Sequence, residues 1–167
     1  PAPLYKPKNA ELVTSCTYDN DIEKIAEVDW VLEAVVERLD IKEKVYNNLL
    51  PHLKDTAILT SNTSGIPLTD LTSSLPDDVK QRFMITHFFN PPRYMQLLEL
   101  VRGEQTSDET YNTLVVFGES VLGKGIVHAK DTPNFIGNRI GVYGMMATMN
   151  LAIKQGLTVE EVDKLTG

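Results

Sequence analysis

The fold is decided by a stretch that begins with ILTSNTSG (residues 58–65), passes through FMITHFFNPP (residues 83–92) and ends in LLELV (residues 97–101). Each part contains a short apolar run, and polar residues either follow that run or lie within it. Short β-rich runs bounded by turn residues predict buried strands of a parallel or mixed sheet. Because such sheets bind ligands outside the carboxyl ends of their strands, we expect the polar residues there to meet a ligand.

Several of these polar side chains suit acid–base chemistry. His87 is of the residue type that titrates near neutral pH, and a carboxylate such as Glu99 beside it would stabilise its charged form and fix its tautomer. Ser64 and Asn62 would hydrogen-bond a substrate oxygen while His87 takes its proton. A purely structural histidine is the alternative, and the convergence of Ser, His and Glu favours the functional interpretation.

Strand and helix patterns alternate around this stretch. The nearly continuous apolar residues at 30–37 are typical of a central parallel strand, and a helix follows over about residues 39–50. Lys42 and its two charged neighbours are expected to face solvent. One stripe of the helix is predicted to be buried: Ile41, Val45 and Leu49.

Shorter elements complete the pattern. An extended arm or loop is expected over residues 1–8, a β-rich run over 12–17 and a short polar helix over 19–26. A short helix rich in Thr and Ser is expected over 67–75, and 125–129 predict a last strand. The alternation of strands and helices places the chain in the α/β class.

Helix caps are predicted in the second half of the chain. A capping box over residues 106–109 starts a helix that Gly123 ends. Another helix begins at about residue 134, is apolar over much of its surface and is capped by Gly156. A second capping box over residues 158–161 opens a further helix. A helix with such broad apolar coverage needs packing partners on several sides.

Composition limits the classes of function. The 167 residues are 42% hydrophobic and 23% charged, as in a soluble globular protein. A formal net charge of −7 argues against binding nucleic acid or an anionic membrane. The single cysteine, Cys16, excludes an intramolecular disulfide and fits a reducing compartment, and without a signal peptide or a long apolar run we expect a cytoplasmic location. No metal site is predicted.

Four separated motifs resemble the signature of the L-3-hydroxyacyl-CoA dehydrogenases of fatty-acid β-oxidation. They are SNTS at 61–64, HFFNP at 87–91, LE at 98–99 and DTPNFIGNR at 131–139. They occur in the family's order, and the resemblance covers roughly residues 11–167. It implies an NAD-dependent enzyme that acts on an acyl-CoA substrate.

The resemblance also implies roles for the site residues. His87 would be the catalytic base, Glu99 would orient it, and Ser64 and Asn138 would hold the substrate oxygen as catalytic residues. Asn90 would line the substrate pocket together with them.

A second group is implied as cofactor-binding: Glu37, Lys42, Ala34 and Asn62. For Glu37 and Lys42 a solvated charge pair is the alternative interpretation.

Domain organisation follows from the same resemblance. Residues 1–131 would form the C-terminal portion of a dinucleotide-binding domain, a partial Rossmann-like sheet with flanking helices. Residues 132–167 would begin an all-helical domain that carries dimer contacts. The chain has no Gly-x-Gly-x-x-Gly after a strand, so we expect a fragment of a longer enzyme. The segment at 91–95 resembles long members fused to a hydratase domain, and Asn134 stands where members more commonly have Gly.

Two other classes of function stay open. Ser64, His87 and Glu99 are also the residue types of a hydrolase triad, although Ser64 lacks the Gly-x-Ser-x-Gly elbow. A non-catalytic assembly module is the other class. A reactive Cys16 is a weaker hypothesis, because no His or basic cluster adjoins it in sequence. Catalytic roles for His128, which lies beside a charged run, and for His52, which lies at the end of a helix pattern, are weaker hypotheses as well.

Overall fold

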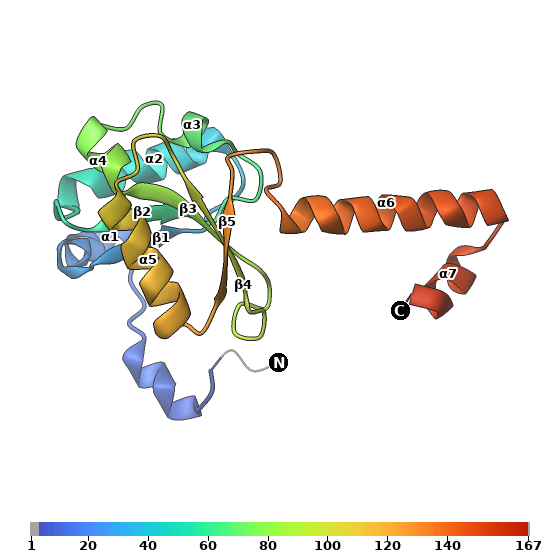
Figure 1. Cartoon of the computed structure of the whole chain (residues 1–167). Coiled ribbons are helices and arrows are strands. Elements are labelled where there is room, and N and C mark those ends of the chain that lie inside the picture. The colour runs from blue at the N-terminus through green and yellow to red at the C-terminus, as the bar shows by residue number, and fades with distance from the viewer. Residues whose placement is uncertain (1–3, 167) are drawn as a thin grey trace. The chain divides into compact units, whose positions relative to one another are not determined.

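Five strands form one mixed sheet in the spatial order β1-β2-β3-β4-β5 (Figure 1). The computed structural model describes residues 4–166, so the first three residues of the predicted arm lie outside the described part. β1, β2 and β3 run parallel, β4 is antiparallel to β3, and β5 is parallel to β4. The predicted α/β class and mixed sheet are therefore confirmed. The strands are β1 Trp30–Glu33, β2 Ile58–Ser61, β3 Phe83–Phe88, β4 Leu97–Arg102 and β5 Gly125–Ala129.

Helices cover both faces of this sheet. On one face α5 packs through Leu114 against Met84 and Leu98. On the other face the Tyr46 ring of α2 meets Phe83 edge-on, with ring centroids 5.6 Å apart. Successive residues of β3 thus serve opposite faces, as the two-residue period of a strand requires. The helices of this part are η1 Pro7–Leu12, α1 Tyr18–Asp21, η2 Ile22–Glu27, α2 Leu39–Leu49, η3 Leu50–His52, α3 Leu68–Leu71, α4 Asp77–Gln81 and α5 Asp108–Ser120.

The N-terminal strand predictions need correction. The apolar run at 30–37 gives a strand only as far as Glu33, and β1 lies at the end of the five-strand order rather than at its centre. The run at 12–17 forms no strand: Leu12 ends η1, and Val13 is 65% exposed. A strand forms only where a neighbouring strand can hydrogen-bond its backbone N–H and C=O groups. Apolar content alone therefore does not predict a strand in these segments. The helix expected at 19–26 is present as α1 followed by η2.

Helix α2 matches its predicted span, but its buried face is different. Leu49 is buried as expected, whereas Ile41 and Val45 are only half-buried. Lys42 does not face solvent; it is 1% exposed, because its ammonium reaches the buried carboxylate of Glu33. Charge alone predicts an outward side chain, and a buried ionic partner reverses that expectation.

Two helix boundaries also differ from the prediction. α3 ends at Leu71, since the hydroxyl of Thr72 bonds the Leu68 carbonyl and Ser73 bonds that of Asp70, which competes with helix continuation. The N-cap of α5 is Ser107 rather than the predicted Thr106, whose hydroxyl donates to the Phe83 carbonyl.

The end of α5 differs slightly from the prediction: the helix ends at Ser120 and its C-cap is Val121, so the predicted cap Gly123 lies two residues beyond it. This glycine has a left-handed φ of 65°, and the Lys124 N–H donates to the Gly118 carbonyl at 2.9 Å across it. The predicted last strand is β5.

The chain divides into two compact units, Pro1–Pro133 and Asn134–Gly167. The second unit holds α6, Gly137–Gln155, and α7, Val159–Thr166. α6 starts later than residue 134, because Asn134 and Phe135 have φ of 62° and 47° in the left-handed region. Its cap is Gly156 as predicted, at φ 68°.

The second capping box is confirmed. The Glu161 N–H donates to the Thr158 hydroxyl at 3.3 Å, and the Thr158 N–H donates to the Glu161 carboxylate at 2.9 Å.

Neither a membrane-spanning helix nor a cluster of metal-ligating side chains is present in residues 4–166. None of the helices there combines the length and the apolar character that a membrane span requires. In the same residues no group of three or more His, Cys, Asp or Glu side chains is arranged to hold a metal ion.

Candidate active site

A buried histidine–carboxylate pair lies where β3 and β4 meet. The antiparallel register places His87 directly opposite Glu99, and both are buried. His87 Nδ1 lies 2.8 Å from Glu99 Oε2. A carboxylate accepts hydrogen bonds, so this pairing favours the tautomer in which Nδ1 donates to Glu99 and Nε2 faces Ser64.

Ser64 completes this arrangement from the loop after β2. Its Oγ lies 3.2 Å from His87 Nε2, and with Nδ1 donating to Glu99 the serine hydroxyl is the donor to Nε2. Ser64 is half-exposed, which leaves it open to a ligand, whereas His87 and Glu99 are enclosed. The three side chains form one line from the surface to the interior, suited to passing a proton inward and stabilising the charge left on the ring.

His87 and Glu99 do not follow the carboxyl ends of their strands, where the sequence analysis expected polar residues to meet a ligand. His87 lies inside β3, and Glu99 lies in the first half of β4. The antiparallel pairing, and not a shared carboxyl edge, brings the two together.

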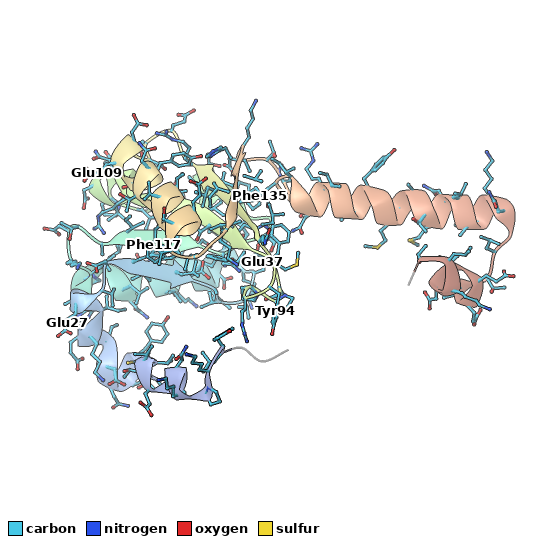
Figure 2. All side chains as sticks on the ribbon, turned by 60° about the horizontal axis from the view of Figure 1, so that its bottom comes forward. Glu27, Glu37, Tyr94, Glu109, Phe117 and Phe135 are labelled. Carbon is cyan, nitrogen blue, oxygen red and sulfur yellow. The ribbon has the colours of Figure 1, made fainter. Side chains whose placement is uncertain are left out.

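Glu37 holds the turn that carries Ser64. Its Oε1 accepts the backbone N–H groups of Ser64 at 2.9 Å and Gly65 at 3.1 Å, together with the Thr63 hydroxyl. Glu37 lies at one end of β1 and Glu27 at the other (Figure 2). Partial burial raises the pKa of Glu37, but the Thr63 hydroxyl, the Ser64 N–H and the Lys42 ammonium outweigh this, and the net pKa lies below its ordinary value.

Glu33 is a site residue that the sequence analysis missed. Its carboxylate is buried and accepts the Lys42 ammonium at 2.8 and 3.0 Å, the Tyr46 hydroxyl at 3.0 Å and the Ser61 hydroxyl at 2.6 Å. Burial, and then the negative charge of Glu33, raise the pKa of Tyr46, so its hydroxyl remains a donor. The usable signal was an acidic residue within an otherwise apolar strand run, since a buried charge requires a partner.

Asn62 braces the ends of three strands. Its N–H donates to the Glu33 carbonyl at 2.7 Å, and its side-chain oxygen accepts the Phe88 N–H at 2.8 Å. It therefore links β1, β2 and β3 beside the histidine. The predicted pocket residue Asn90 is exposed just after β3, and the predicted cofactor residue Ala34 is exposed just after β1.

Asn138 belongs to α6 of the second unit, where it is half-buried. Its role beside Ser64 stays a prediction.

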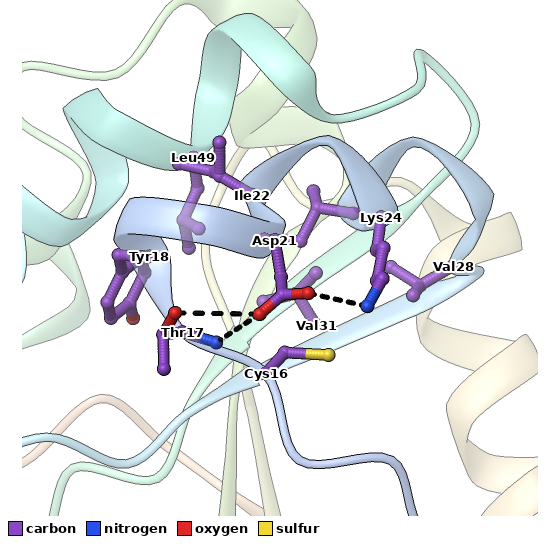
Figure 3. A pocket seen from close by; sticks show the side chains of 10 residues that line it. Cys16, Thr17, Tyr18, Asp21, Ile22, Lys24, Val28, Val31 and Leu49 are labelled. Carbon is purple, nitrogen blue, oxygen red and sulfur yellow. Dashed lines mark hydrogen bonds and ion pairs between the residues drawn. The ribbon is translucent and has the colours of Figure 1, made fainter.

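The other residues weighed as candidates lie elsewhere. Cys16 lines a cavity of about 380 Å³ beside α1, η2 and α2, where Asp21 accepts from Thr17 and Lys24 (Figure 3). None of Ser64, His87 and Glu99 lines this cavity. His128 is exposed and bonds the Tyr111 hydroxyl, and His52 is exposed in η3.

The polar residues around the His87–Glu99 pair suit the nicotinamide end of a dinucleotide. The exposed carboxylate of Glu37, the half-exposed Asn62 and Ser64 lie around the His87 pair and offer polar contacts for a ribose and a ring carboxamide. The sequence has no glycine-rich turn for a pyrophosphate. The α/β sheet with these groups beside its strand ends defines a Rossmann-like dinucleotide-binding domain.

The chain belongs to the 3-hydroxyacyl-CoA dehydrogenase family. Residues 3–132 match the family model described as "3-hydroxyacyl-CoA dehydrogenase, NAD binding domain", so NAD is the cofactor of this domain. This result confirms the resemblance and the cofactor predicted from the motifs.

Relatives and solved structures agree with this membership. The chain is 46% identical over its whole length to a "Probable 3-hydroxyacyl-CoA dehydrogenase" of Bacillus subtilis, of which it covers 21%. A protein of the same description from Deinococcus radiodurans is 42% identical over the whole chain, which covers 48% of it. The crystal structure of (S)-3-hydroxybutyryl-CoA dehydrogenase from Ralstonia eutropha superposes with a TM-score of 0.76 at 32% identity, covering 88% of this chain and 50% of that one. The chain thus spans half or less of these proteins.

Proposed function

We propose that the intact protein oxidises an L-3-hydroxyacyl-CoA to a 3-oxoacyl-CoA with NAD, as in fatty-acid β-oxidation. The observation that carries this proposal is the line from Ser64 Oγ through His87 to the buried Glu99 carboxylate. His87 Nε2 accepts the proton of the substrate's 3-hydroxyl, and Glu99 balances the charge that the imidazole gains. Bound NAD would supply the acceptor for the hydride that leaves C3 of the substrate.

Ser64 serves as a donor to the substrate oxygen in this mechanism. Its hydroxyl exchanges its bond with His87 for one with the substrate, while Glu37 keeps the backbone of the turn in place. Asn138 would add a second contact to the same oxygen, and Asn90 would line the acyl pocket. These two assignments rest on the family motifs.

Contacts to the nicotinamide end are assigned to Glu37, Asn62 and Ala34, whose positions after β1 and β2 support them. Lys42 belongs to the same group by family resemblance. Its ammonium is held by Glu33 at 2.8 Å and by Glu37 at 3.3 Å, which supports a contribution made through Glu37.

The assay that tests this function is NADH oxidation with acetoacetyl-CoA, run on the intact protein and on its His87→Gln variant. We expect His87→Gln to lower kcat by about 100- to 10,000-fold, the usual contribution of a general acid–base group. The Kd for NADH should change little, because His87 is buried and acts on the substrate oxygen. An equal loss of cofactor affinity and of turnover would contradict the role of His87.

A serine hydrolase is the second candidate, since Ser64, His87 and Glu99 are linked as in a catalytic triad. One feature argues against it: the N–H groups of Ser64 and Gly65, which would serve as oxyanion-hole donors, already donate to Glu37. Labelling of Ser64 by a fluorophosphonate would favour the hydrolase, and we expect none.

A further inference from the structure

The buried carboxylate of Glu33 has two separate hydrogen-bonded routes to the turn at residues 63–65. In the first, Glu33 holds the Lys42 ammonium, which lies 3.3 Å from Glu37 Oε2, and the other oxygen of Glu37 accepts the Ser64 and Gly65 N–H groups. In the second, the Ser61 hydroxyl donates to Glu33 at 2.6 Å and accepts the Thr63 N–H at 3.2 Å.

Burial makes Glu33 the fixed end of both routes. Its side chain is 0% exposed and that of Lys42 is 1% exposed, whereas 44% of the Glu37 side chain faces solvent. The Val35 N–H also donates to Glu33 at 2.6 Å, so both of its oxygens are satisfied from several directions. A carboxylate bound in this way has one orientation. Its hydrogen bonds with Lys42 and Ser61 therefore fix the orientations of those two side chains.

The charges explain why Glu37 would lose its position if the negative charge of Glu33 were removed. One ammonium serves two carboxylates, and its two bonds to Glu33 are shorter than its contact with Glu37. Without the charge of Glu33, the buried ammonium loses its main partner and moves toward solvent with Glu37. Glu37 then leaves the amides of the Ser64 turn.

We propose that Glu33 is a positioning residue that sets the place of Ser64 beside His87. The proposal rests on the dehydrogenase function proposed above. The Glu33 side chain is fully buried, so it acts through Lys42, Glu37 and Ser61, with Tyr46 as an additional donor.

The first test follows the turn without using activity. Amide hydrogen exchange of Ser64 and Gly65 is measured in the intact protein and in its Glu33→Gln variant, and we expect the variant to exchange at least about tenfold faster. Thr60→Val is the matched control, because Thr60 is equally buried in β2 but bonds Trp30 and Thr86. Unchanged exchange in Glu33→Gln, or an equal increase in Thr60→Val, would overturn the proposal.

The second test is a double-mutant cycle for acetoacetyl-CoA reduction. We expect Glu33→Gln to lower kcat about 10- to 100-fold when Ser64 is present, the scale of a misplaced catalytic group, and less than about threefold in a Ser64→Ala background. A purely structural role would give the same fold loss in both backgrounds, and that result would overturn the proposal. Tyr46→Phe, which keeps the ion pair, should show a smaller loss with the same dependence on Ser64.

The two tests separate this proposal from the function it rests on. A wild-type protein with no acetoacetyl-CoA reductase activity would refute the proposed function. The exchange of Ser64 and Gly65 amides would then still decide whether Glu33 positions the turn.

Discussion

At the scale of single residues, Glu37 couples the active-site turn to pH. Its pKa is lowered on folding below the ordinary 4.5, because donors from Thr63, Ser64 and Lys42 outweigh the effect of partial burial. A carboxyl of this kind stabilises the fold above its ordinary pKa, and that contribution is lost as the pH falls through the folded-state pKa.

We therefore expect wild type to be more stable than Glu37→Gln at about pH 7 and this advantage to shrink below pH 4.5. Urea denaturation of both proteins at about pH 7 and about pH 3 measures the difference in unfolding free energy. A difference that stays constant or grows on acidification would show that Glu37 is not held by these donors.

Lys42 shows, at the same scale, how far sequence reasoning reaches. The family resemblance implied that Lys42 is a site residue. The charged residues beside it in the sequence led us to expect that its side chain faces solvent. The structure turns it inward because Glu33, nine residues earlier in the chain, offers a buried carboxylate. A single sequence does not show that pairing, since the two residues meet only when α2 packs on the sheet.

At the scale of elements, Ser107 and not Thr106 is the N-cap of α5. The Ser107 hydroxyl accepts the Thr110 N–H at 3.1 Å, whereas Thr106 is buried and bonded to β3. We expect Ser107→Ala to lower the unfolding free energy by about 1 kcal/mol, the usual value of an N-cap. Thermal or urea unfolding measures it.

Glu109→Ala is the control for this prediction. The capping box expected from the sequence would make Glu109 as important as the cap, while the structure predicts a change within about 0.5 kcal/mol. Equal losses of unfolding free energy in Ser107→Ala and Glu109→Ala would support the capping box of residues 106–109 and contradict the structure.

The elements also show where local patterns suffice. The box at Thr158 and Glu161 and the glycine cap at 156 depend on neighbours along the chain, and both are present as predicted. The strand expected at 12–17 depends on a distant partner strand, and it did not form.

At the scale of the whole molecule, the second unit does not by itself cover the apolar side chains of α6. No residue of α6 is buried, and Ile140, Tyr143 and Ile153 are 67%, 76% and 78% exposed. Apolar surface of this kind is stabilised by a partner. The predicted homo-oligomer through the helical region therefore remains our proposal.

We expect residues 1–167 to sediment as a dimer or larger species and a chain that ends at Pro133 to sediment as a monomer. Analytical ultracentrifugation of both chains provides the measurement. Two monomers would refute assembly through the helical unit, whereas a stable oligomer that binds no NADH would favour the assembly module over the enzyme.

The α/β class and the family could be read from the sequence, and Ser64, His87 and Glu99 could be proposed as site residues, because these inferences rest on local patterns and on motifs of fixed spacing. Only the tertiary structure decided that antiparallel pairing sets Glu99 against His87 and that Glu33 gathers Lys42, Tyr46 and Ser61 in the interior. The physical reason is that strand register and buried charge pairs join residues far apart in the chain. Their energies depend on what surrounds them, which a local pattern does not contain.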